Sequence, residues 1–200
     1  MPQIFLTGLI VLFCTMVGLA AEQANPVDNF NTAGKMYENG KYQQAINEAN
    51  QGIQQIRTKM AEQLKEIFPA PPSGWQAEEA TVDVLPNIMM LSGISGRRMY
   101  RPSTGQGSVE IQILSQSPLH VLYSAAVMNS ELAQLAGYKL QKVGAQTGLV
   151  KEEKNQTTLS MLLGTSVVNV ESKHLEDNYK IALMFWERLD AAQIQNMFQF

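Results

Sequence analysis

Residues 65–75 read KEIFPAPPSGW, and the pattern of the chain changes at this stretch. Proline lacks a backbone N–H and restricts the residue before it, so Pro69, Pro71 and Pro72 end a helix and favour extended backbone. Apolar side chains at positions 67, 68 and 75 flank these prolines. Because a free tether would leave them in water, we expect a semi-rigid corner that docks the preceding helices onto the following domain.

The segment before the corner has helical periodicity, with apolar residues at steps of three and four. These residues are Ala33, Met36, Tyr37, Tyr42, Ala45, Ile46, Ala49, Ile53, Ile56, Met60, Leu64 and Ile67. Asn39-Gly40 provides a break, since glycine tolerates the left-handed conformation that ends a helix. The pattern predicts two antiparallel helices, the second running from about Tyr42 to Ile67.

Residues 33–53, AGKMYENGKYQQAINEANQGI, resemble a tetratricopeptide repeat. The matching small and large residues are Ala33, Tyr37, Gly40, Tyr42, Ala45, Ile46 and Ala49. The resemblance implies protein binding through a concave surface, which requires several stacked repeats. Only one copy is present, so two interpretations stand: a structural helical hairpin, or part of a peptide-binding array. A single repeat must pack on the rest of the chain or on a partner.

After the corner the period changes to two, which is typical of strands. Candidate strands lie at 81–85, 96–100, 109–113, 138–143, 149–153, 159–163 and 167–170. Most of the Gly, Asn and Ser turns between them have hairpin length, so the sheet should be mainly antiparallel. The sequence therefore predicts an α+β fold, with the helical hairpin packed on this sheet and two helices covering it.

The first covering helix should start at Ser117-Pro118, restart near Asn129 and end at Gly137. Its predicted inward residues are Leu119, Leu122, Tyr123, Ala126 and Val127. The last helix should begin near Ser172 and end after Met197, with Leu175, Tyr179, Ala182, Leu183, Trp186 and Leu189 on one face. This order over about residues 68–200 resembles the Mog1/PsbP-like α/β sandwiches, a likeness of fold that implies no function.

The N-terminus is apolar and uncharged over residues 4–21 and ends in small residues at the spacing that signal peptidase accepts. We expect export to the periplasm or beyond, with cleavage after Ala20 or Ala21; an uncleaved inner-membrane anchor is the alternative. Cleavage would remove Cys14, the only cysteine. The predicted organisation is a signal peptide or anchor at 1–21, a hairpin at 22–68, the corner at 69–75 and a sheet domain at 76–200.

Charge and motifs argue against several functions. The 15 Lys+Arg against 18 Asp+Glu leave no basic balance suited to nucleic acid. No G-x-S-x-G elbow or phosphate-binding loop occurs, and His120 and His174 are expected to be polar residues near helix starts. His174, Glu176 and Asp177 are spaced so that they scatter around a helical turn, which argues against a metal site. We expect no catalytic residues, no cofactor and no metal.

Two stretches are candidates for interaction. In the sequence Arg97-Arg98-Met99-Tyr100-Arg101, residues 97, 99 and 101 should share one face of a strand, as an anionic-partner patch or as a solvated or edge strand. Residues 85–91 are apolar but contain Pro86, as in a partner surface or a loop tucked over the sheet. The candidate surface comprises Tyr37, Tyr42, Ile88, Met89, Met90, Arg97, Arg98 and Arg101.

Together these features favour an exported, non-enzymatic binding or assembly module. The expected partner is another envelope protein, with no nucleic acid, and with membrane contact only if the N-terminal segment is retained. The alternative is a small-ligand carrier or hydrolytic enzyme whose site is dispersed over the sheet domain.

Overall fold

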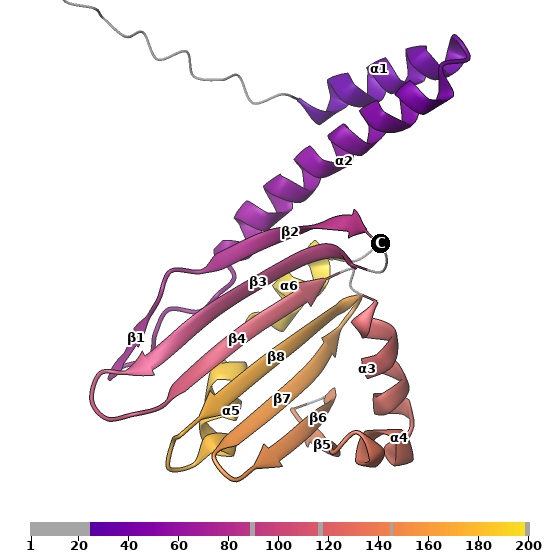
Figure 1. Ribbon diagram of the computed structural model, residues 1–200. Coiled ribbons are helices and arrows are strands. Elements are labelled where there is room, and N and C mark those ends of the chain that lie inside the picture. Colours follow the sequence, from indigo (N-terminus) through magenta and orange to yellow (C-terminus); the bar gives the residue numbers. More distant parts are fainter. Residues whose placement is uncertain (1–24, 89–90, 116–117, 145, 199–200) are drawn as a thin grey trace, which may run out of the picture.

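The computed structural model describes residues 25–88, 91–115, 118–144 and 146–198, which form an α+β fold as predicted (Figure 1). The helices are α1 (Pro26–Glu38), α2 (Tyr42–Lys65), α3 (Leu119–Met128), α4 (Ser130–Leu135), α5 (Asn178–Trp186) and α6 (Ala191–Met197). The strands are β1 (Trp75–Ala77), β2 (Thr81–Ile88), β3 (Leu91–Pro102), β4 (Ser108–Ser115), β5 (Lys139–Val143), β6 (Gln146–Glu153), β7 (Gln156–Leu163) and β8 (Ser166–Lys173).

All described strand pairs are antiparallel, and they join into one sheet with the order β1-β3-β4-β8-β7-β6-β5. β2 pairs with the same edge of β3 as β1 does. Two meanders, β2-β3-β4 and β5-β6-β7-β8, are thus joined by the pairing of β4 with β8. Hairpin-length turns produce this arrangement, since they connect only antiparallel neighbours.

The core lies on one face of the sheet. Residues alternate along β4 between half-buried and buried, and the buried Ile111 and Ile113 lie opposite Val170 and Val168 of β8. Helix α5 packs against β7 and β8 and inserts the fully buried Phe185, whose ring lies 4.8 Å from that of Tyr100. Alternate residues of the strands and one face of α5 thus pack together in a single core.

Helix α3 lies on the opposite face. Leu149 and Val167 alternate to that face, are buried, and do not belong to the main core. Helix α3 contacts the three strands β6, β7 and β8 there. The restart predicted near Asn129 is confirmed, because its side chain accepts from the N–H groups of Glu131 and Leu132 at the start of α4.

The prediction of one continuous C-terminal helix from Ser172 is wrong. β8 extends to Lys173, and two helices follow instead. Each has its own carboxylate cap: the Asp177 side chain accepts from Lys180 N, and that of Asp190 from Gln193 N. An Asp at each position satisfies the first N–H groups of a new helix, so the chain turns between them.

The proline-rich stretch forms a tight connection between α2 and β1. Ile67 and Phe68 are buried in the main core, and the Trp75 ring packs edge-on against Phe185 at 4.9 Å. Two side chains of β3 hold the backbone here. Tyr100 Oη donates to Pro69 O at 2.8 Å, while Arg98 donates to the carbonyls of Phe68, Pro69 and Glu78.

Helices α1 and α2 form the predicted hairpin, with the break at Asn39-Gly40, where Gly40 has a φ of 71°. Helix α1 packs along α2, and the C-terminal part of α2 lies against β2 and β3. The rest of the hairpin extends away from the sheet (Figure 1). Its internal core is thin, since the buried residues of this part are Ala33, Ala45 and Gly52.

Candidate functional site

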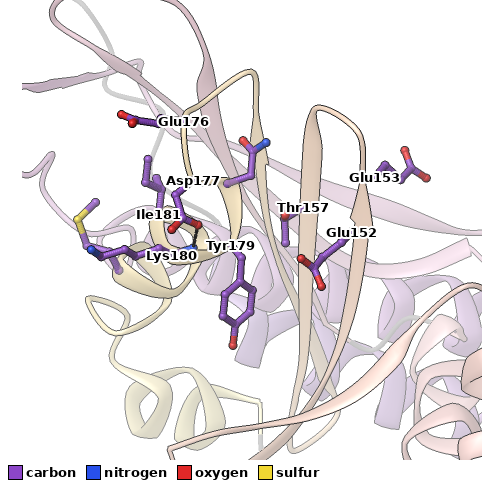
Figure 2. A pocket seen from close by; sticks show the side chains of 10 residues that line it. Glu152, Glu153, Thr157, Glu176, Asp177, Tyr179, Lys180 and Ile181 are labelled. Atoms are coloured by element: carbon purple, nitrogen blue, oxygen red, sulfur yellow. Dashed lines mark hydrogen bonds between the residues drawn. The ribbon is translucent and has the colours of Figure 1, made fainter.

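A cleft of about 830 Å³ lies between the β6–β7 hairpin and the start of α5. It is rich in carboxylates, with Glu152, Glu153, Glu176 and Asp177 against one ammonium, that of Lys180. Figure 2 shows that these carboxylates do not converge: Glu153 and Glu176 lie at opposite sides, and Asp177 is occupied in capping α5. The cleft therefore offers no assembled pair of acid and base.

The electrostatics of this cleft also argue against an acid–base site. Lys151 Nζ lies 2.8 Å from Glu153 Oε1 and lowers the pKa of that carboxyl. A general acid at neutral pH needs the opposite shift, towards a raised pKa. No group of three or more His, Cys, Asp or Glu residues that could hold a metal ion exists in the described part of the chain.

Neither histidine is placed to act as a catalytic base. His120 Nε2 lies 2.8 Å from Gly164 O, and because a carbonyl can only accept, this nitrogen carries the proton. The Ser124 hydroxyl, 3.5 Å from the same nitrogen, therefore has no base there to accept its proton. His174 has a φ of 55° and lies in the connection between β8 and α5 rather than in a helix.

The arginines of β3 divide between the two faces as the alternation predicts. Arg97 and Arg101 lie on the face away from the core, where they contact Thr81 Oγ1 and Glu78 Oε1, both at 3.1 Å. Arg98 lies on the core face and binds the backbone of the corner. The edge-strand interpretation is wrong for this stretch, because β3 is paired on both sides.

A small cavity of about 260 Å³ lies beside Arg97. Its lining residues are Glu78, Glu79, Thr81, Arg97, Met99 and Glu110. Ligand pockets span about 300–1,000 Å³ and are mostly apolar. This cavity is smaller and lined mainly by charged and polar side chains, so it does not resemble a pocket for an organic ligand.

The described residues of the apolar stretch, 85–88 and 91, belong to strands rather than to a loop. Leu85 and Ile88 lie in β2, with a register irregularity between them, and Leu91 begins β3. Met89 and Met90, two of the predicted interaction residues, lie outside the described residues.

Exposed large hydrophobic side chains gather on two parts of the molecule. Among the described residues there are thirteen, and all lie on four helices. The hairpin surface consists of Val27, Phe30, Tyr37, Tyr42, Ile46, Ile53 and Ile56. The α3–α4 surface consists of Leu119, Val121, Leu122, Met128, Leu132 and Leu135. Where the structure describes side-chain exposure, which leaves out residues 86–92, the sheet and the pair α5–α6 contribute none, so the exposure is concentrated and not scattered.

The hairpin surface contains a groove of about 420 Å³ between α1 and α2. Ala33, Gly34, Tyr37, Tyr42, Ala45, Ile46 and Ala49 line it. Of these, Ala33 and Ala45 are buried, whereas Tyr37, Tyr42 and Ile46 are exposed. The rings of Tyr37 and Tyr42 meet edge-on at 5.5 Å at the tip of the hairpin. The two tyrosines proposed from sequence thus lie together on one exposed, apolar face.

The α3–α4 surface was missed by sequence reasoning. Leu119 and Leu122 were predicted to point inward, yet they are 43% and 67% exposed, and α3 has no buried residue at all. A shallow cavity of about 140 Å³ there is lined by Leu122, Tyr123, Ala126, Ala136, Tyr138 and Leu149. Burial, together with the neighbouring Tyr123, raises the pKa of Tyr138 to about 12. The absence of charge on α3 was visible in the sequence, but its exposure was not.

None of the helices in the described ranges is long and apolar enough to span a membrane. The predicted signal peptide or anchor lies outside those ranges. The chain matches no protein-family model, and searches of curated proteins and of solved structures returned no match. The resemblances to a tetratricopeptide repeat and to the Mog1/PsbP-like sandwiches therefore stay predictions.

Proposed function

We propose that this chain is a non-enzymatic assembly module of the cell envelope, exported across the inner membrane, that binds other proteins through the hairpin surface and the α3–α4 surface. One observation carries the proposal: the thirteen large hydrophobic side chains that the structure describes as exposed all lie on these two surfaces. Water penalises exposed apolar area by about 25 cal/mol per Å², so each surface gains by being covered.

The hairpin gives the strongest support. Three small residues form the buried contacts of its distal part, and a two-helix unit with so little core gains most of its stability from tertiary packing. A partner that covers Tyr37, Tyr42 and Ile46 would supply that packing. The α3–α4 surface supplies a second contact on the other side of the sheet domain from the main core.

Photo-crosslinking in the native cell tests this function. A photoreactive amino acid is placed at Ile46 or at Leu122, with matched controls at Gln44 of α2 and Gln134 of α4, which are exposed and polar. Defined protein adducts are expected at the apolar positions and not at their controls. Equal labelling of all four positions, or none, would contradict a role in assembly.

A further inference from the structure

Helix α2 carries an apolar stripe at heptad spacing. Tyr42, Ile46, Ala49, Ile53, Ile56 and Met60 follow one another at steps of four, three, four, three and four. Residues at such steps share one face of a helix and form the seam along which two helices pack knobs into holes. Tyr42, Ile46, Ile53 and Ile56 are 61%, 54%, 39% and 40% exposed, so the seam is open in the single chain.

The same face of α2 continues towards its C-terminus, where it packs against the sheet domain. Leu64 and Ile67 extend the stripe by four and seven residues from Met60, and both are buried against the sheet domain. The sheet domain covers the C-terminal end of the stripe, whereas the hairpin projects beyond it (Figure 1). The stripe is thus longer than the surface that the described residues of its own chain provide.

We propose that the open part of this stripe binds the same stripe of a second copy, with the two α2 helices antiparallel, so that two hairpins form a four-helix bundle. This inference rests on the proposed function and names the partner of the hairpin surface. A twofold axis near Gln51 would pair Ile46 of one copy with Ile56 of the other. It would likewise pair Tyr42 with Met60 and Ala49 with Ile53.

The stripe is self-complementary in size under this symmetry. The small Ala49 faces the larger Ile53, while the two isoleucines at 46 and 56 face each other across the seam. An isologous contact of this kind uses one surface twice and closes on itself as a dimer. No further surface is needed to complete it.

The seam contains no acidic or basic side chain. The six stripe residues include no Asp, Glu, Lys, Arg or His, so pairing the stripes buries no such group. A parallel pair would bring both sheet domains to the same end of the bundle. The antiparallel pair places one sheet domain at each end.

The dimensions suit a reversible dimer. From Tyr42 to Met60 the helix rises about 27 Å, and two helices side by side are about 20 Å wide. Each copy would therefore bury about 500 Å², or about 1,000 Å² in total, which is at the lower end of specific interfaces. At its end the seam meets a cleft of about 580 Å³, which is lined by Met60, Gln63, Glu66, Gln193, Asn196 and Met197. The amides among these side chains offer partners to the incoming Tyr42 hydroxyl.

Sedimentation velocity over a concentration series tests the dimer. The chain is purified from cells with its N-terminal segment as the cell leaves it. We expect a dimer that dissociates on dilution, and we expect the double variant Ile46→Glu with Ile53→Glu to weaken it at least about 100-fold, because two charges per copy would enter the seam. The double variant Gln44→Glu with Gln54→Glu adds the same two charges to exposed positions of α2 outside the stripe and should leave the dimer unchanged. The substituted positions of both double variants are exposed in the monomer, and circular dichroism checks the fold.

Cysteine mixing tests the orientation, in a Cys14→Ser background. Chains carrying Ala49→Cys are mixed with chains carrying Ile53→Cys and oxidised. Antiparallel helices give mainly the mixed 49–53 disulfide, whereas parallel helices give the two homodimers and would overturn the inference. A chain that stays monomeric at 100-fold its photo-crosslinking concentration would overturn it as well. If such a monomer still gives adducts at Ile46, the dimer is refuted but the proposed function survives. If the monomer gives no adducts, the dimer and the proposed function are both refuted.

Discussion

The two halves of α2 present one apolar face to opposite environments. In the C-terminal half, Leu64 is fully buried, and a side chain on Gly96 of β3 would collide with Leu64 Cδ2 at 2.9 Å and with the Phe68 ring at 3.1 Å. In the N-terminal half, Ile46 and Ile53 continue the same face in solvent. The helix is alike in both halves, and the difference lies in what stands opposite. A glycine on a paired strand provides the space that one half fills.

This comparison separates two uses of an apolar residue, namely holding the fold together and remaining available for a partner. The first kind of residue is shielded from water by its own chain. The second keeps a free energy of burial that only association can realise. Substitutions in the C-terminal half should therefore lower the free energy of unfolding, whereas matched substitutions in the N-terminal half should weaken association.

Truncation of Leu64 should have the largest effect on stability. Leu64→Ala leaves a cavity between α2 and β3, and we expect it to lower the free energy of unfolding by about 3 kcal/mol. Ile53→Ala in the other half should cost less than about 1 kcal/mol when the chain is dilute, because its side chain is already partly hydrated. Urea unfolding of both variants, followed by circular dichroism, measures this difference. Similar losses would mean that the hairpin face is covered within the chain.

Substitution of Arg98 should cause the second-largest loss of stability. Arg98→Met keeps the packing of the stem but removes the hydrogen bonds to the carbonyls of Phe68, Pro69 and Glu78, and we expect a loss of about 2 kcal/mol. Arg97→Met removes one exposed bond to Thr81 and should cost less than about 0.5 kcal/mol. Thermal unfolding of the pair compares them. If Arg97 mattered as much as Arg98, the role of Arg98 in holding the corner would be refuted.

Sequence reasoning succeeded where periodicity and turn chemistry determine the outcome. The break at Asn39-Gly40, the alternation of Arg97 and Arg98 between faces, and the restart at Asn129 follow from local rules. It failed at the C-terminal helix, because a run of apolar residues at helical steps does not reveal that Asp190 starts a new helix. Periodicity indicates a face, while caps and tertiary packing decide its length.

Gly96→Ala should have a smaller effect than these losses. The added methyl group would meet the ends of the Leu64 and Phe68 side chains, which can shift by a few tenths of an ångström, so we expect a loss of about 1 kcal/mol. Gly34→Ala in α1 meets nothing within 4 Å and should stabilise the dilute chain by about 0.5 kcal/mol through helix propensity. Opposite signs for the two glycines in chemical unfolding are the expected result; a stable Gly96→Ala variant would show that the contact at α2 is loose.

The candidate site could be predicted only in part. Tyr37 and Tyr42 were found because a resemblance to a helical repeat drew attention to them. Helical spacing assigns the leucines of α3 to the interior, and nothing in a single sequence shows that Leu119 and Leu122 remain exposed where α3 lies on the sheet. The sequence places Arg98 on the candidate surface, whereas the structure uses it to hold the corner. Its partners are backbone carbonyls about 20 to 30 residues away, and no side-chain pattern encodes such contacts.

The Tyr100 hydroxyl should have a modest effect that depends on pH. Burial raises the pKa of Tyr100 to about 12, against 10.0 for an ordinary tyrosine, although the nearby Arg98 opposes the shift. Because the folded state favours the protonated form, its contribution to stability is complete below pH 10 and is lost as the pH rises to about 12. Tyr100→Phe should cost about 1 kcal/mol at pH 7 through the bond to Pro69 O. The stability difference between the two proteins should fall through zero and reverse over that pH window, because the penalty for ionising the buried phenol exceeds the contribution of one hydrogen bond; urea unfolding at each pH measures it. A difference that stays constant from pH 9 to 12 would mean that the hydroxyl titrates as it does in water, and that the corner is open at Tyr100.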